Sequence, residues 1–183
     1  VVVSLKNLNQ ISELIQTVKK YNPESLESFD RHTLMLGLKF MPEIAKKVHK
    51  SLLAFIWGFR REVKQTLIYS LPIFTVLVEL TGDKEKDIQN RANKLGAELS
   101  KEGIHNLIMN SEEEGEKYWI MRRESFSLLR EKVKNKMATP FVDDFSVKPE
   151  YLSKFLPELY KLLEDNEIQP TLAGHVGDGN FHI

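Results

Sequence analysis

Two kinds of apolar pattern alternate along this chain, and their alternation constrains the fold more than any other feature of the sequence. Short apolar and β-branched runs predict strands, while apolar residues at intervals of three and four predict amphipathic helices between them. Strands are expected at Val1–Leu5, Leu26–Asp30, Ile73–Thr81, Ile104–Met109, Val142–Val147 and Thr171–Gly174. Separated β-α-β units around one sheet predict an α+β, ferredoxin-like architecture, with an antiparallel sheet covered by helices on one side.

The expected helices are marked by apolar stripes and by residues that begin or end a helix. Asp30 can cap the segment that follows the second strand, Gly103 is expected to end a helix, and Ser111 with Glu114 matches a capping box. The segment 33–68 has helical character without clear boundaries. One stripe consists of Ile11, Leu14, Ile15 and Val18, and a second consists of Ile88, Ala92, Leu95 and Leu99. A further helix is expected over Leu152–Leu163.

Composition excludes several classes of function. With 183 residues, of which 42% are hydrophobic, the chain can bury one core, and we expect one domain over residues 1–183. Lys+Arg and Asp+Glu number 26 each, so no net charge favours a nucleic acid partner. The absence of cysteine excludes disulfides, thiolate metal sites and a cysteine nucleophile.

The ends of the chain and its apolar runs indicate where it belongs. No apolar run approaches the roughly 18–20 residues of a membrane span, so no transmembrane segment is expected. We expect a cytoplasmic protein, and peripheral attachment to the inner face of the membrane and a homodimer stay open. The chain begins Val-Val-Val without methionine and stops within a strand-like run, so we expect it to be cut from a longer protein at both ends.

The last ten residues, Gly174–Ile183, hold the densest candidate site. Three glycines within six residues exclude a helix and indicate a sharp loop. On a helix, His175 and His182 would lie roughly 10 Å apart along the axis, too far to share one ion. If the loop folds back, both rings can point to one spot and form a half-site for a divalent metal. The alternative is a glycine turn with two incidental histidines.

This segment resembles the GHxGDGNxH signature of the C-terminal (cap) domain of FAD-linked oxidases, the family of D-lactate dehydrogenases, the glycolate oxidase flavoprotein subunit and D-2-hydroxyglutarate dehydrogenases. The match covers Gly174, His175, Gly177, Asp178, Gly179, Asn180 and His182. The resemblance implies that FAD is bound mainly by a domain outside this chain, with Gly177, Gly179 and Asn180 near the isoalloxazine ring. It implies that His175 and His182 bind a divalent metal, expected to be zinc. The family's third ligand, a glutamate, and its catalytic histidine base would lie beyond Ile183.

One predicted helix carries a cation within an apolar stripe. The stripe recurs at spacings of three and four and consists of Trp119, Arg122, Phe126, Leu129 and Val133. Arg122 therefore needs a partner, whereas Arg123 lies about 100° away on a more polar face. The partner could be an internal carboxylate, Asp143 or Asp144, or the carboxylate of a substrate held by a bidentate pair. Trp119-x-x-Arg122 is also similar to the family's W-x-x-R element, whose arginine binds the carboxylate of a 2-hydroxy acid.

The segment Pro140–Val147 resembles the family's strand with an acidic pair, but two positions differ from the 2-hydroxyglutarate enzymes. Those relatives carry a lysine where this chain has Val142 and a hydroxyl residue where it has Phe126. The resemblance therefore favours a monocarboxylic substrate such as D-lactate. For Asp143 and Asp144, a solvated strand edge or a salt bridge is expected rather than acid–base chemistry.

The resemblance implies the substrate domain of an FAD-dependent 2-hydroxy-acid dehydrogenase of the D-lactate or glycolate type. Hydride would pass from substrate C2 to the flavin, a metal-bound hydroxyl would lose its proton, and Arg122 would anchor the carboxylate. The electron acceptor stays open, and the isolated chain is expected to be inactive. The alternative from another class is a non-catalytic ligand-sensing or interaction module, because ferredoxin-like folds host many functions. A hydrolase built on the histidine pair ranks last.

Overall fold

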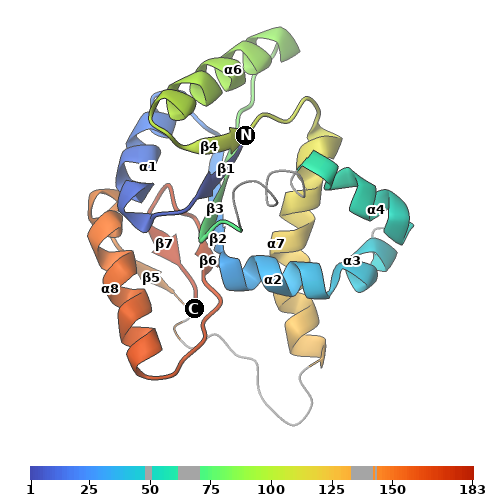
Figure 1. The fold of residues 1–183 in the computed structure, drawn as a ribbon. Helices are drawn as coiled ribbons and strands as arrows, with labels where there is room; N and C mark the ends of the chain where they lie inside the picture. The colour runs from blue at the N-terminus through green and yellow to red at the C-terminus, as the bar shows by residue number, and fades with distance from the viewer. Residues whose placement is uncertain (48–50, 62–70, 133–141, 143) are drawn as a thin grey trace.

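The computed structural model describes residues 1–47, 51–61, 71–132, 142 and 144–183, apart from the side chains of residues 113, 126, 129 and 132. Its centre is a five-stranded antiparallel sheet with the strand order β4-β1-β3-β2-β6 (Figure 1). The strands are β1 (Val2–Leu5), β2 (Ser25–Asp30), β3 (Phe74–Glu79), β4 (His105–Leu107) and β6 (Ala173–Gly174).

Two β-α-β units interleave to build this sheet. The first joins β1 to β2 through α1 (Ile11–Lys19), and the second joins β3 to β4 through α6 (Glu85–Lys101). Antiparallel pairing of β1 with β3 and β4, and of β2 with β3, gives the ferredoxin-like order. The predicted α+β class and ferredoxin-like sheet are therefore confirmed, with β6 added beside β2.

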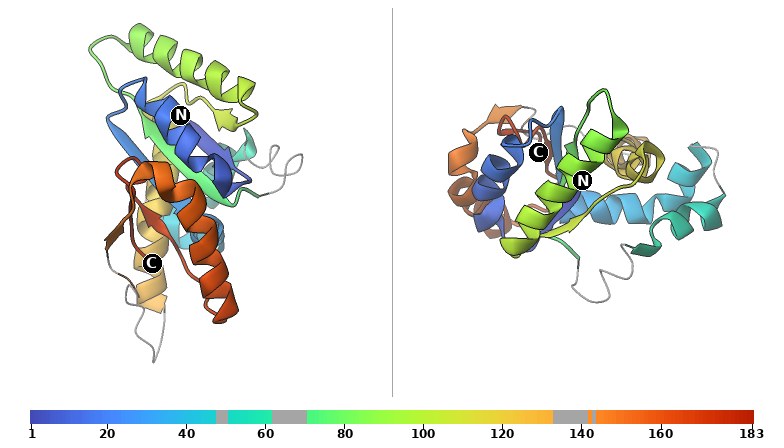
Figure 2. Two further views of the ribbon diagram at one scale, coloured as in Figure 1. Left: turned by 90° about the vertical axis from the view of Figure 1, so that its left-hand side faces the viewer. Right: turned by 90° about the horizontal axis from the view of Figure 1, so that it is seen from above.

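Helices pack on both faces of the sheet, but unequally. The larger apolar core lies between one face and α1, α6 and α8 (Leu152–Asp165), with Val3, Val76, Ile15, Leu95 and Leu156 among its members. In the left view of Figure 2, α1 and α8 lie in front of the sheet, and α7 (Glu112–Lys132) lies behind it. Tyr118 of α7 joins a smaller cluster on that opposite face, with Val2, Phe29 and Leu77. The expected one-sided cover thus describes the main core, and α7 adds partial cover on the other side.

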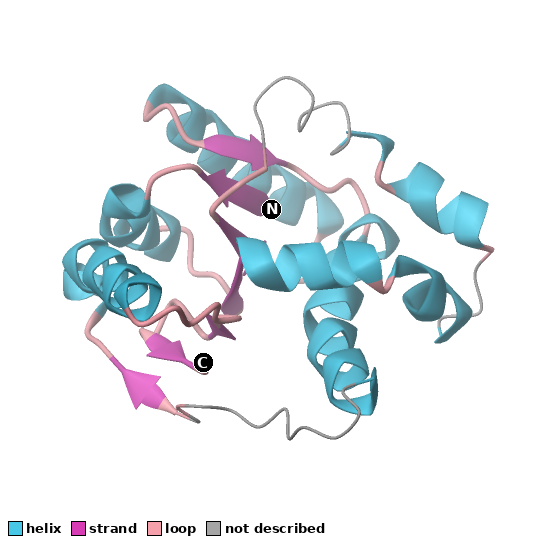
Figure 3. Cartoon of the chain, turned by 60° about the horizontal axis from the view of Figure 1, so that its bottom comes forward, coloured by secondary structure: helices cyan, strands magenta, loops and turns pink. Residues whose placement is uncertain are grey.

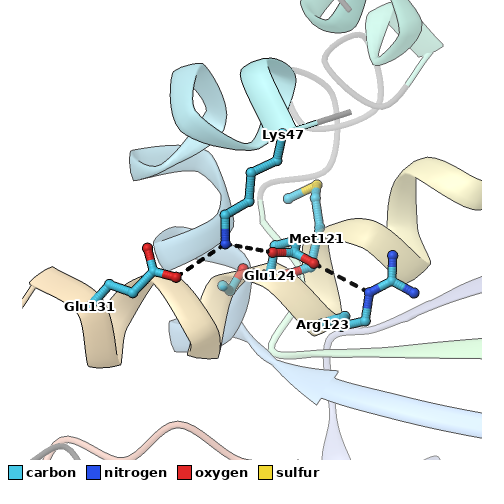
Figure 4. A network of polar contacts seen from close by, with 6 residues as sticks. Lys47, Met121, Arg123, Glu124 and Glu131 are labelled. Atoms are coloured by element: carbon cyan, nitrogen blue, oxygen red, sulfur yellow. Dashed lines mark hydrogen bonds and ion pairs between the residues drawn. The ribbon is translucent and has the colours of Figure 1, made fainter. Parts of the chain in front are cut away.

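An insertion of short helices separates β2 from β3. Its described helices are α2 (Arg31–Lys39), α3 (Met41–Lys47) and α4 (Leu52–Gly58), which form an apolar cluster with α7. Lys47 ties α3 to α7 through Glu124 at 3.0 Å and Glu131 at 3.3 Å (Figure 4). These helices account for most of the segment 33–68 in which helical character was expected.

The apolar stripe predicted on α7 is one position out of register. Among the described side chains of α7, the buried ones are Lys117, Tyr118, Ile120, Met121, Ser125 and Leu128, whereas Trp119 and Arg122 are half-buried. The reason is that α7 packs against the insertion as well as the sheet, so no single stripe faces all of its contacts. The side chains of Phe126 and Leu129, and the whole of Val133, lie outside the described residues.

Most predicted helix signals hold. Asp30 caps α2 by accepting a hydrogen bond from Thr33 N at 2.8 Å. Ser111 Oγ accepts from Glu114 N at 3.2 Å, while the Glu114 carboxylate reaches back to Asn110 N, one residue earlier than a standard capping box. Gly103, with φ of 73°, follows the end of α6 as expected.

The chain ends in a small second sheet, in which β5 (Phe145–Ser146) pairs with β7 (Asn180–Phe181) near the C-terminus (Figure 3). The predicted strand Val142–Val147 is thus shorter as a regular element. Val142 exchanges backbone hydrogen bonds with Ile183, and Val147 N donates to Gly179 O. These bonds bring the C-terminal segment against this strand, next to β6.

Candidate functional site

The site begins with Glu27 on β2, a carboxylate buried to 6% exposure. In the register of β2 with β6, Ser28 lies opposite Gly174 and Phe29 opposite Ala173. Because side chains alternate along paired strands, Glu27 shares the face of Phe29 and lies beside His175, the residue that follows β6. That face is the one covered by α7.

The two signature histidines lie on the same face of the terminal segment. Ala173 and His182 form an antiparallel bridge, exchanging backbone hydrogen bonds of 3.2 and 2.9 Å. Since His175 is two residues from Ala173, alternation places its side chain on the face of His182. Val176 and Phe181, at the intervening positions, are buried in the main core on the opposite face.

One carboxylate joins the candidate metal and substrate residues. Glu27 Oε1 lies 2.5 Å from His175 Nδ1, and Glu27 Oε2 is in contact with Arg122 Nη2. Arg122 thus finds an internal partner in Glu27, a residue that the sequence did not predict. Asp144 instead accepts a hydrogen bond from Asn180, and Asp143 lies outside the described residues.

Burial and charge act in opposite directions on this carboxylate. Burial raises the pKa of Glu27, and the positive charge of Arg122 opposes the rise, followed by the effects of His175 and His182. Arg122 Nε is buried and has no hydrogen-bond partner among the residues that the structure describes. A buried carboxylate of this kind is retained only with close positive or hydrogen-bonding partners.

A cavity of about 390 Å³ opens beside Arg122. Its wall includes three arginines, Arg122, Arg123 and Arg130, together with His182 and the hydroxyl side chain of Thr33. No acidic side chain is found among the described residues that line it. Arg122 and Arg123 are each paired with a carboxylate outside the lining, Glu27 and Glu124, so the wall combines N–H donors with charges that are already partly balanced.

Residues 1–183 match the family described as FAD linked oxidases, C-terminal domain, over their whole length. The chain belongs to this family. Membership in the FAD-linked oxidase family agrees with the resemblance carried by the terminal glycine–histidine segment, and it implies FAD as the cofactor.

Curated relatives of this FAD-linked oxidase domain share the name D-2-hydroxyglutarate dehydrogenase. The protein from Escherichia coli K12 is 30% identical over 114 residues, covering 58% of this chain and 11% of its own length. The protein from Pantoea ananatis is 27% identical over 70% of this chain and 13% of its own length. The protein from Pseudomonas putida is 23% identical over 89% of this chain and 15% of its own length. The chain therefore spans a small fraction of these relatives.

Close packing within the FAD-linked oxidase domain itself accounts for two of the signature glycines. Gly179 has a φ of 71°, and a Cβ there would lie 1.7 Å from Val147 O. A Cβ on Gly177 would lie 3.0 Å from Leu26 Cβ. The side-chain amide of Asn180 donates hydrogen bonds to Asp144 and to Ser146 Oγ. Close approach of these residues to a flavin stays a prediction, since their own packing already requires the two glycines.

The metal prediction finds a partial set of ligands. Two imidazoles share a face, and the Nδ1 of His175 is engaged by Glu27, so its Nε2 is the nitrogen left for a metal. Within the described part of the chain, no group of three or more histidine, cysteine or acidic residues is arranged to hold an ion. The residues therefore fit a two-histidine half-site, and zinc binding stays a prediction.

Glu27 is the site residue that sequence reasoning missed. It stands inside a strand whose neighbours Leu26 and Phe29 are buried, and an acidic side chain inside such a strand is the signal that could have revealed it. Among the other histidines, His32 pairs with Asp30 at 3.5 Å, and His49 lies outside the described residues. None of the described helices combines the length and apolar character needed to cross a bilayer.

Proposed function

We propose that this chain is the substrate-binding domain of an FAD-dependent dehydrogenase of D-2-hydroxy acids. The observation that supports it most is the meeting of Arg122 and His175 on Glu27, beside a cavity lined by cations. Arg122 and His182 both line this pocket, and a guanidinium together with an imidazole matches the two functional groups of a 2-hydroxy acid, a carboxylate and a hydroxyl. Family membership supplies the flavin chemistry.

In this proposal, Arg122 binds the substrate carboxylate and thereby orients C2. Its guanidinium is planar and always charged, and contact with Glu27 limits its rotation. Holding one end of the substrate in a fixed place contributes to rate by removing unproductive orientations. Arg123 does not share this geometry, because its side chain is 70% exposed and pairs with Glu124 (Figure 4).

His175 and His182 bind the hydroxyl end through a divalent ion in this proposal. Bound flavin would accept the hydride from C2, and the ion would lower the pKa of the hydroxyl. His175 and His182 would hold the ion from the α7 face of the sheet, the face on which Arg122 meets Glu27. The carboxylate and the hydroxyl of one substrate molecule can then be held at the same time.

For the substrate class, we propose a monocarboxylic 2-hydroxy acid such as D-lactate. Val142, where the diacid enzymes have a lysine, is paired by its backbone to Ile183, which lines the cavity. An apolar side chain at this position disfavours a second carboxylate. The second candidate is a diacid, favoured by the names of the relatives and by Arg130 in the cavity wall.

The test is anaerobic reduction of the flavin in the flavoprotein that carries this chain. D-lactate, D-2-hydroxybutyrate, D-2-hydroxyglutarate and their L-enantiomers would be mixed with it in a stopped-flow spectrometer. We expect bleaching of the oxidised flavin band with D-acids and little with L-acids. A flavoprotein that no 2-hydroxy acid reduces would contradict the proposal and favour a non-catalytic ligand-binding role.

A further inference from the structure

We propose that Glu27 is a positioning residue that orients both Arg122 and His175, so that one buried carboxylate aligns the two ends of the substrate site. The inference rests on the proposed function, because it takes Arg122 as the carboxylate anchor and His175 as a metal ligand. Neither the family signature nor the names of the relatives point to this residue, which lies about 150 positions before the signature.

The strand register makes this position fixed rather than incidental. Glu27 lies opposite Leu77 in the pairing of β2 with β3, and it is flanked on the other side by the pairing of β2 with β6. Hydrogen bonding along both edges of β2 holds the backbone of Glu27 in place. Its side chain must therefore project toward α7, where Arg122 lies.

The two carboxylate oxygens serve different partners. Oε1 lies 2.5 Å from His175 Nδ1, and Oε2 is in contact with Arg122 Nη2. A hydrogen bond from Nδ1–H to a carboxylate fixes the ring orientation and leaves the lone pair on Nε2 for a metal. The same carboxylate pairs with the guanidinium of Arg122, which lines the cavity.

Only a carboxylate of this length satisfies both partners at once. A glutamine offers one oxygen acceptor, and its NH₂ group can only donate. If that oxygen faces Arg122, the NH₂ faces His175 Nδ1 and favours the tautomer with the proton on Nε2, which blocks metal binding. If the oxygen faces His175, two groups of donors meet at Arg122. Aspartate keeps the charge but withdraws it by one methylene from both partners.

The experiment compares zinc affinity and steady-state kinetics in the intact flavoprotein. The variants are Glu27→Gln, Glu27→Asp and, as a matched control, Glu79→Gln, a glutamate exposed on the neighbouring strand β3. Zinc affinity is measured by competition with a chromophoric chelator, with FAD content and the thermal midpoint recorded to verify folding. We expect Glu27→Gln to weaken zinc binding by about 10–100-fold and to raise KM for the acid, while Glu79→Gln leaves both within twofold.

Arg122→Ala separates positioning from a general loss of structure. It should raise KM while leaving zinc affinity within about threefold, because it does not touch His175. Glu27→Gln should then affect both ends, so in the Arg122→Ala background its effect on KM should shrink, while its effect on zinc affinity should remain. If Glu27→Gln destabilises the fold, Glu27→Asp gives the same comparison with the buried charge retained.

The outcomes distinguish this inference from the proposed function. If the wild-type flavoprotein is reduced by D-2-hydroxy acids and binds zinc, but Glu27→Gln and Glu27→Asp match it in zinc affinity and KM, the inference is wrong and the function stands. If the wild-type flavoprotein neither binds zinc nor is reduced by any 2-hydroxy acid, the proposed function fails and the inference fails with it.

Discussion

Strand β2 carries two buried carboxylates, Glu27 and Asp30, that face opposite sides of the sheet because they are three residues apart. Their exposure is similar, 6% and 1%. Their partners are not. Asp30 Oδ1 accepts hydrogen bonds from the backbone and hydroxyl of Thr33 at 2.8 and 2.7 Å, and Oδ2 accepts one from Tyr160 at 3.2 Å.

The partners show what each carboxylate does. The donors nearest to Asp30 are a neutral amide and two hydroxyls, which connect β2 to the first turn of α2 and to α8, and the imidazole of His32 lies farther away at 3.5 Å. Burial followed by the charge of Asp30 raises the pKa of Tyr160, so its hydroxyl remains a donor. Glu27 instead meets an arginine and a histidine next to a cavity. One face of the strand thus carries a structural carboxylate, and the other carries a carboxylate that organises the candidate site.

The largest effect expected on the Glu27 side is the loss of the anchor itself. In the intact flavoprotein, Arg122→Ala should lower kcat/KM for the 2-hydroxy acid. The loss should correspond to about 2–4 kcal/mol of transition-state free energy, because a charge-assisted pair with the substrate is lost. Arg122→Lys should restore only part of this, since lysine lacks the planar fork. Steady-state kinetics would measure both.

Arg123→Ala is the comparison for this effect, because it removes the next cation along the same helix. We expect its loss in kcat/KM to be at least tenfold smaller, since Arg123 pairs with Glu124 and is largely exposed. An Arg122→Ala enzyme with undiminished kcat/KM would leave Arg122 with only its internal ion pair to Glu27.

Substitution of Asp30 should lower the stability of the fold rather than catalysis. Asp30→Ala removes a helix cap and leaves buried donors unpaired, so the free energy of unfolding should fall by about 2–3 kcal/mol. Asp30→Asn keeps an oxygen acceptor for Thr33 and should lose less. Denaturant unfolding measures the change. If Asp30→Ala weakens zinc binding but leaves the free energy of unfolding unchanged, the structural role assigned to Asp30 is wrong.

Sequence patterns could predict the sheet because its strands and flanking helices each carry a local signal. The stripe Ile11–Val18 and the Leu95–Leu99 part of the second stripe face one continuous core, so their period alone indicates which side is buried. The same reasoning failed for α7, which contacts the sheet and the insertion helices on different sides. A stripe of spacing three and four could not reveal which of two partners each residue meets.

The candidate site was predictable where its residues are close in sequence. His175 and His182 share one short segment, and the tryptophan–arginine element shares one helix turn. Glu27 could not be assigned from spacing, because its contacts with Arg122 and His175 depend on the register of β2 and β6 and on the docking of α7. Long-range pairing of this kind is a property of the folded chain, which explains why Glu27 was not among the partners expected for Arg122.

A smaller effect concerns the far end of the substrate. We expect kcat/KM for D-lactate or D-2-hydroxybutyrate to exceed that for D-2-hydroxyglutarate by at least about tenfold, because an unpaired second carboxylate near Val142 would lose hydration. Phe126→Thr with Val142→Lys should shift the preference toward the diacid. A wild-type preference for the diacid would instead point to Arg130, in the cavity wall, as the second cation.

The smallest expected effect is the contribution of His32 to stability. Its Nδ1 lies 3.5 Å from Asp30 Oδ2. The hydrogen bond to Asp30 raises the pKa of His32 above its ordinary 6.5, and burial partly opposes the rise. A raised folded-state pKa means that the contribution of His32 to stability is fully present below pH 6.5 and is lost as the pH rises through the folded value. Because nearly half of the side chain is exposed, solvent screening limits this contribution to about 0.5 kcal/mol.

The difference in unfolding free energy between wild type and His32→Gln should therefore be larger at pH 5 than at pH 9, and it should lose this pH dependence in an Asp30→Asn background. An equal difference at both pH values in the wild-type background would show that His32 does not use the charge of Asp30.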